Sequence, residues 1–362
     1  MVSVNSDVQN YNNLSNFSRT MRQNNTIPAV SNKVTLTDKF ITGVKNQEEI
    51  DTKGNWALRN VGMFTAQIPL YLGYLYGLEQ LIKACGAPKG QVAKAFGKSF
   101  KNIGIAAAIS SCISFAISKY LNSKTEENNK KLAQTFNEIN TDTNAKMADK
   151  MSYPKTAEAF YYPMSGKIQF NQNTINDPIL SRNIDKKIKH ELVHAKQYET
   201  VARSQDGIKK VNYVTLNQIK RNIEKANAKE SFDAIYKDIQ NNGNKYDDTR
   251  IKLMGGAVEV NLKDYITALH TLLNNPDATY NDIPIVIDLK HYQEVIDKKG
   301  KLTPDEETKA DEYYKAMLDY KSVNFFSALN PWSDYRQNIL EKEAYKENPS
   351  IITKMSDWFG QG

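Results

Sequence analysis

The stretch RNIDKKIKHELVHAKQYETVAR, residues 182–203, predicts a long amphipathic helix. A branched apolar residue recurs every fourth position at Ile184, Ile188 and Leu192, which is the spacing of one helix face. Ser181 stands just before the stretch and is a candidate N-cap. We therefore expect a helix from about 182 to 203 that buries this apolar stripe in the core of a domain.

The same helix carries two histidines at a spacing typical of a metal site. His190 and His194 are four residues apart and therefore lie on one face, one turn above the other. Both imidazoles can then reach a single cation at about 2 Å. Glu191 points to a neighbouring sector, where its carboxylate can act as general base on a water held by the metal. The chain has only four histidines, so a chance match to this HExxH pattern is rare. The alternative is that both are ordinary surface or core histidines.

A catalytic zinc site needs a third protein ligand, with the fourth position left for water or substrate. The metzincin pattern requires a histidine at position 200, where this chain has Thr200, so that pattern is excluded. Glu199 is near in sequence but badly rotated relative to both histidines. His270 and His291 are weaker options, and His270 is better explained as a packed or rim histidine.

HELVH at 190–194, together with NILEKEAY at 338–345, resembles the gluzincin arrangement. In gluzincins, HExxH on one helix is completed by a glutamate on a second helix. In several such families, including CAAX-type membrane proteases and the regulatory peptidases of phage-repressor systems, that glutamate opens an ExxA motif. The resemblance implies that Glu341 is the third zinc ligand, with Glu343 in reserve, and that Ala344 lets the two helices approach closely. The alternative is that both glutamates are plain helix-surface charges.

One departure from the families concerns the residue after the alanine. The CAAX-type families carry aspartate there, and this chain has Tyr345. A carboxylate that would orient a histidine is therefore missing from that place.

The resemblance implies a mainly helical α+β domain, zincin-like, with a short sheet and the HExxH helix. Its expected limits are 151–350, with a helical insert at about 205–330. Short strands are predicted at 159–162 and 167–171, and zincins place such a segment beside the cleft, where a peptide substrate can add as a further strand.

The function that the resemblance implies is that of a zinc metallopeptidase. Zn²⁺ would be held by His190, His194 and Glu341, and Glu191 would be the catalytic base for hydrolysis of a peptide or protein substrate. The alternative is a non-catalytic, metal-stabilised zincin-like module that binds partners at a membrane.

Further helices are predicted near 208–241, 259–274, 304–320 and 333–346. The start of the helix at 304–320 is indicated by the sequence Thr303-Pro304-Asp305-Glu306. It contains an N-cap residue, a proline at the first helical position and a capping-box glutamate. Ser333 is the expected cap of the last.

The region before the domain has a different composition. Residues 1–55 are polar and asparagine-rich, contain no secretory signal and predict a mostly disordered tail. Residues 56–121 contain two uncharged stretches, 61–78 and 103–118, which predict a hydrophobic helical hairpin. The hairpin is either two transmembrane helices, which would make the protein membrane-associated, or a buried pair in a cytoplasmic protein. A third, weaker alternative makes this hairpin the main functional part, as a membrane-active segment. Residues 122–150 predict a linker, and 351–362 a tail.

The composition narrows the classes of partner. A net charge of +7 on 362 residues is modest, and no arginine-rich stretch or zinc-finger spacing accompanies it, so no nucleic-acid partner is expected. Cys85 and Cys112 form neither a CxxC pair nor a disulfide framework. A zinc site in this chain would therefore use nitrogen and oxygen ligands.

Overall fold

The computed structural model describes residues 35–42, 120, 123–151, 158–177, 180–253, 256–320 and 334–347. The chain divides into two compact units, one of residues 1–53 with 129–362 and one of residues 54–128. Both uncharged stretches of the predicted hairpin, and the predicted tail at 351–362, lie outside the described residues. Within the described ranges, no helix is long and apolar enough to cross a membrane.

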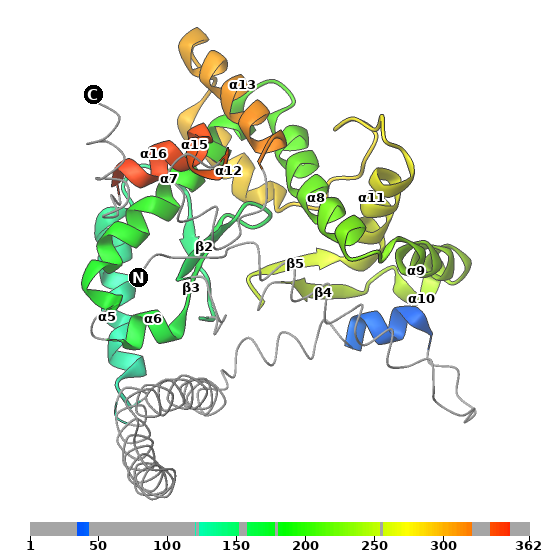
Figure 1. Cartoon of the computed structure of the whole chain (residues 1–362), viewed down its shortest axis with the longest axis horizontal. Coiled ribbons are helices and arrows are strands. Elements are labelled where there is room, and N and C mark those ends of the chain that lie inside the picture. The colour runs from blue at the N-terminus through cyan, green and yellow to red at the C-terminus, as the bar shows by residue number, and fades with distance from the viewer. Residues whose placement is uncertain are drawn as a thin grey trace, which may run out of the picture. The chain divides into compact units, whose positions relative to one another are not determined.

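The larger unit contains a three-stranded sheet that packs against the HExxH helix. The strands β1 (Lys146–Met147), β2 (Ala159–Tyr162) and β3 (Lys167–Phe170) lie in the order β1-β3-β2. Strand β3 is parallel to β1 and antiparallel to β2, with Tyr161 opposite Ile168. The two strands predicted from the sequence are thus confirmed as β2 and β3. Helix α7 (Ile184–Arg203) packs against β2 (Figure 1).

Helix α7 buries the predicted apolar stripe but begins later than predicted. Ile188 and Leu192 are buried, and Ala195 extends the stripe by another turn. The predicted cap at Ser181 is wrong, because a 3₁₀ helix spans Leu180–Asn183 and leads directly into α7. The tighter 3₁₀ turn already hydrogen-bonds these residues, so the α-helix starts without a side-chain cap.

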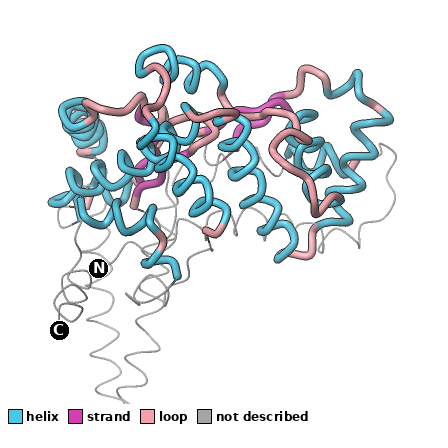
Figure 2. Tube along the Cα trace, turned by 90° about the horizontal axis from the view of Figure 1, so that it is seen from above, coloured by secondary structure: helices cyan, strands magenta, loops and turns pink. Residues whose placement is uncertain are grey.

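The rest of the unit is mainly helical, as the sequence predicted, and Figure 2 shows short strands between many helices. The bounds are α6 Gln172–Asn176, α8 Gly207–Lys225, α9 Lys229–Asn241, α10 Gly243–Tyr246, α11 Leu262–Asn274, α12 Leu289–Lys299, α13 Pro304–Leu318, α15 Asp334–Gln337 and α16 Ile339–Glu347. The predicted capping box of α13 is present, with Thr303 and Glu306 bonding reciprocally. An antiparallel hairpin of β4 (Arg250–Leu253) and β5 (Val258–Asn261) lies inside the predicted helical insert and was not predicted.

The domain includes most of the segment that was predicted to be a linker. Helix α5 (Thr125–Ile139) buries Leu132 and Phe136, and strand β1 completes the sheet. The ring of Phe136 contacts that of Phe170 edge-on, with 6.4 Å between centroids. The burial of α5 and the pairing of β1 were not predicted for residues 122–150, which were expected to form a connecting helix or linker.

A short helix at residues 36–42 also belongs to this unit, although the sequence predicted a mostly disordered tail there. Phe40 is buried, and its ring lies 6.0 Å from that of Phe232 in α9. The fully buried Thr37 donates a hydrogen bond to Asp238 on the same helix. Apolar and polar contacts together hold this segment against α9.

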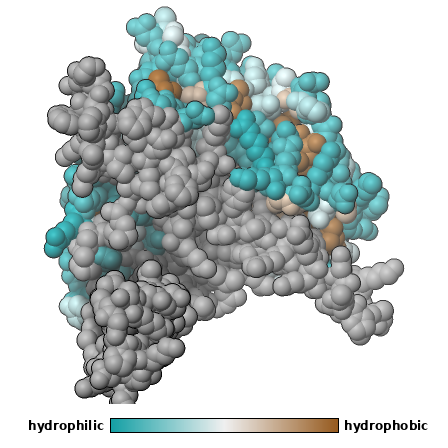
Figure 3. Space-filling model, in the orientation of Figure 1, coloured by the Kyte–Doolittle hydropathy of each residue, from teal (hydrophilic) through white to brown (hydrophobic). Residues whose placement is uncertain are grey.

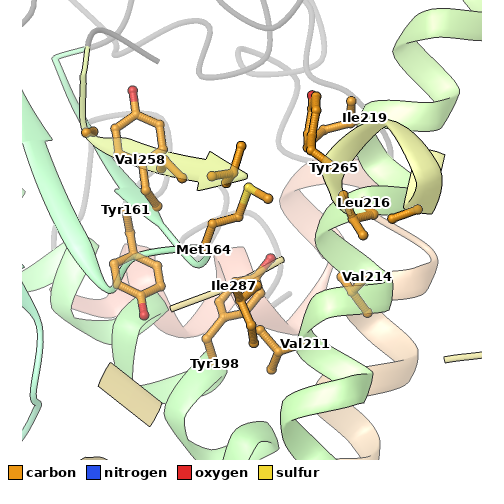
Figure 4. Packing of buried hydrophobic residues seen from close by; sticks show 14 of the residues in the cluster. Tyr161, Met164, Tyr198, Val211, Val214, Leu216, Ile219, Val258, Tyr265 and Ile287 are labelled. Atoms are coloured by element: carbon orange, nitrogen blue, oxygen red, sulfur yellow. The ribbon is translucent and has the colours of Figure 1, made fainter. Parts of the chain in front are cut away.

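The hydrophobic core lies between the three-stranded sheet, α7, α8 and the β4–β5 hairpin. Figure 4 shows Tyr161 of β2, Met164 of the following turn and Tyr198 of α7 among the apolar side chains of α8 and of strand β5. On the face drawn in Figure 3, the described surface is largely hydrophilic. The apolar residues of the described elements are thus gathered inside.

The turn between β2 and β3 generates a prediction about stability. Gly166 has φ +64°, and a Cβ at this position would overlap the imidazole ring of the buried His291. Gly300 has φ +69°, but its Cβ would meet nothing within 4 Å. We expect both alanine variants to be destabilised by backbone strain, and Gly166→Ala to lose about 1–3 kcal/mol more through overpacking. Urea unfolding of both variants measures the difference, and equal losses would contradict the overlap with His291.

Candidate metal centre

The two histidines of α7 bring their ring nitrogens together as the sequence predicted. The Nε2 atoms of His190 and His194 lie 3.3 Å apart, and the rings are nearly perpendicular. Two ligands on a tetrahedral zinc with bonds of about 2.0–2.1 Å lie about 3.3–3.4 Å from each other. The separation of the imidazoles is therefore that of two ligands on one ion. The side chain of His190 is 13% exposed and that of His194 is 16% exposed.

Helix α16 places Glu341 opposite this pair. The carboxylate oxygens of Glu341 lie 3.5 Å from Nε2 of His194 and 3.9 Å from Nε2 of His190. One ligand atom from each of the three side chains lies within 4.8 Å of the other two. Ala344 is fully buried, and α16 packs directly on α7 (Figure 1). The small side chain permits the close approach that brings the carboxylate to the histidines.

The carboxylate of Glu341 is buried and incompletely satisfied. Its side chain is 3% exposed. Tyr320 donates its hydroxyl to Oε1 at 2.8 Å. Oε2 is buried and accepts no hydrogen bond from the part of the chain that the structure describes. A buried anionic oxygen without a donor is costly, and a cation beside it would remove that cost.

The wall beside His190 is aromatic. The ring of Tyr345 packs on the imidazole of His190, with 4.9 Å between centroids and 62° between planes. Tyr345 is itself 8% exposed. Position 345 is the place where the CAAX-type families carry aspartate. In this chain the side chain at that position, Tyr345, makes an aromatic ring contact with His190 instead of a contact through a carboxylate.

Glu191 lies beside the three side chains without being one of them. Its Oε2 accepts a hydrogen bond from the backbone N–H of Tyr161 in β2 at 3.0 Å. Burial raises the pKa of Glu191 to about 7, and the carboxylate of Glu341 adds to that rise, while His194 and the Tyr161 N–H oppose it. A group whose pKa lies near neutrality is well matched to proton transfer.

Gln197, for which no role was predicted, and Glu343, the predicted reserve ligand, form a second layer behind His194. Gln197 Oε1 lies 3.0 Å from Nδ1 of His194. The amide nitrogen Nε2 of Gln197 donates to the backbone carbonyl of Leu340 at 3.0 Å and to Glu343 Oε2 at 3.2 Å. Glu343, the reserve ligand, thus contacts Gln197. The three-residue group of possible metal ligands contains Glu341 and not Glu343.

Other ligand candidates are engaged elsewhere. Glu199 is buried and accepts hydrogen bonds from Lys299 Nζ at 2.7 Å and from the backbone N–H of Asn144 at 2.6 Å. His270 stacks on Tyr236 with 3.6 Å between centroids, as expected of a packed or rim histidine. His291 is buried in α12, and burial lowers the pKa of its imidazole. Neither of these histidines belongs to the group of possible metal ligands among the described residues.

The different contacts of the two glutamates on α16 generate a prediction about metal uptake. Zinc binding should stabilise the wild-type protein by about 4 kcal/mol when free zinc is 1,000 times its dissociation constant. We expect Glu341→Gln, which removes the buried charge, to abolish this gain and the zinc content measured by plasma emission spectrometry. The matched variant Glu343→Gln should still take up zinc, although more weakly, because Glu343 contacts Gln197 and not the ion. Equal zinc content in wild type and Glu341→Gln would exclude Glu341 as a ligand.

No family model matches the chain, and neither a curated protein nor a solved structure matches it at a significant level. The resemblance to gluzincins therefore rests on two short motifs, 190–194 and 341–344. The packing of the helices that carry these motifs adds a geometric observation that the sequence did not contain.

Proposed function

We propose that this chain is a zinc-dependent peptidase. The observation that carries the proposal is the convergence of His190, His194 and Glu341, whose ligand atoms, one from each residue, all lie within 4.8 Å of one another, beside the carboxylate of Glu191. Structural zinc sites use four protein ligands, whereas catalytic sites use three and keep one position open. Among the described residues the group has three members, which favours the catalytic class.

The chemistry of the donor set favours zinc. Two imidazoles and one carboxylate are borderline ligands that suit Zn²⁺, whereas Ca²⁺ and Mg²⁺ prefer all-oxygen sites. The unsatisfied Oε2 of Glu341 gives the site a place for a positive charge. The residues present therefore fit the ion.

Zinc bound at this position would lower the pKa of a water molecule and polarise the carbonyl of the scissile bond. Glu191 would accept the proton of that water and deliver it to the leaving amine. The N–H of Tyr161 holds one carboxylate oxygen of Glu191 and thereby fixes the direction of the other. This hydrogen bond would hold the carboxylate in one orientation before substrate binds.

The position of β2 supports a peptide as substrate. Among the described strands, β2 lies at an edge of its sheet; its Tyr161 N–H already donates to Glu191, so a peptide would pair with the other outward-facing backbone groups of the strand. An extended peptide can add to an exposed strand edge through main-chain hydrogen bonds. A peptide lying along β2 would bring a backbone carbonyl close to the group of three ligands.

The proposal predicts that Glu191→Gln separates metal binding from hydrolysis. Zinc content should stay at the wild-type level, because Glu191 is not a ligand. Cleavage of a mixed peptide library, followed by mass spectrometry, should slow by about 10²–10⁴-fold, since the amide cannot accept a proton.

Lys189→Gln provides the matched control, because Lys189 is an exposed neighbour on the same helix. This variant should retain both zinc and cleavage. Stoichiometric zinc without cleavage of any library peptide by the wild type would refute the peptidase assignment and favour a non-catalytic module. A protein that takes up no zinc would refute the whole proposal.

A further inference from the structure

The hydrogen bonds around Gln197 determine which way its amide points. Nε2 of Gln197 lies within hydrogen-bond distance of the Leu340 carbonyl and of Glu343. Both of these partners are acceptors, so the amide –NH₂ must face them. The amide oxygen is then the atom that lies 3.0 Å from Nδ1 of His194.

Because a carbonyl oxygen can only accept, this orientation determines the proton position on His194. Nδ1 must carry the proton in order to donate to Gln197 Oε1. In the neutral ring, Nε2 then holds the free lone pair. Nε2 is also the atom that faces Glu341 and His190.

Glu343 is held in place from a third helix. Tyr313 of α13 donates its hydroxyl to Glu343 Oε2 at 2.7 Å, and Lys309 lies 3.0 Å from Oε1. These contacts hold the carboxylate with its oxygens towards α13 and Gln197. A chain of hydrogen bonds therefore runs from Tyr313 to Glu343, from Glu343 to Gln197, and from Gln197 to the imidazole of His194.

We propose that Gln197 is a positioning residue that selects the Nδ1–H tautomer of His194 and so presents Nε2 to the metal. Glu343 and Tyr313 support it by fixing the direction of the amide. The inference rests on the proposed metal site and assigns a role that HExxH itself does not specify. Metal-bound histidines in general donate their second ring N–H to such a partner, which fixes the ring and raises its basicity.

The first test reads the tautomer directly in the metal-free, full-length protein. Long-range ¹H–¹⁵N correlation spectra distinguish the two ring nitrogens, and with four histidines in the chain the assignment by single substitutions is practical. At a pH where the imidazoles are neutral, the wild type should show a protonated Nδ1 on His194. A protonated Nε2 overturns the inference. This spectrum needs no variant at position 197, so a failure of that variant to fold does not remove the test.

The second test uses Gln197→Met, which keeps the length of the side chain and removes both hydrogen-bonding groups. The ring should then populate both tautomers, and competition with a chromophoric chelator should give a zinc dissociation constant about 10–100-fold weaker. Thr200→Val is the control, because the Thr200 hydroxyl donates to the Lys196 carbonyl one turn back on the same helix and not to the metal ligands, and it should change neither measurement. An unchanged dissociation constant in folded Gln197→Met overturns the positioning role.

The two proposals fail in different ways. A wild-type protein with the expected tautomer that takes up no zinc refutes the proposed function, while it supports the hydrogen-bond assignment of Gln197. Zinc uptake with the opposite tautomer overturns the role of Gln197 and leaves the metal site supported.

Discussion

The burial of one carboxylate, that of Glu341, is the constraint on which the site depends. A carboxylate removed from water loses several kcal/mol of solvation unless donors or cations replace the water. Here the replacement is partial: the Tyr320 hydroxyl donates to Oε1, which also lies 3.5 Å from Nε2 of His194, while Oε2 lies 3.9 Å from Nε2 of His190. In the proposed metal site, a cation between the carboxylate and the histidines would supply the missing partner.

The position of α16 follows from contacts on several sides. Asn338, just before the helix, donates to the Ala316 carbonyl of α13 at 3.0 Å, and Gln197 donates to the Leu340 carbonyl from α7. Glu343 adds its bonds to α13. The short helix is therefore fixed by polar contacts at its start and middle, while Ala344 supplies the close packing. Holding α16 in this way fixes the direction of Glu341.

Local patterns in the sequence predicted the parts of this structure that depend on local physics. Helical spacing predicted the buried face of α7 and the shared face of its two histidines, and a run of capping residues predicted the start of α13. The two short strands on either side of Gly166 were also predicted. The pairing of α16 with α7 could not be derived from periodicity, and the choice of Glu341 came only from a resemblance. The structure brings Glu341 to the histidines and leaves the reserve candidate on Gln197.

The missed features have physical reasons too. The apolar residues of α5 are sparse in a polar segment, so their burial depends on distant partners such as Phe170. The strands β4 and β5 do alternate polar and apolar residues, but a helix was predicted from residue 259 onward inside a helical insert, so the hairpin was not recognised. The role of Gln197 depends on an acceptor far away in sequence. The prediction of a membrane hairpin at 56–121 concerns residues outside the described ranges and stays a prediction.

The distance along the chain between the two motifs has a consequence for folding. His194 and Glu341 enclose α8 to α13 and the second hairpin, which together form much of the described domain. Bringing the ends of such a long loop together has an entropic cost that is recovered only after the intervening elements have packed. All three side chains, His190, His194 and Glu341, can therefore bind one cation only late in folding. The proposed metal site, and any hydrolysis that depends on it, would therefore form only after the domain between the two motifs has folded.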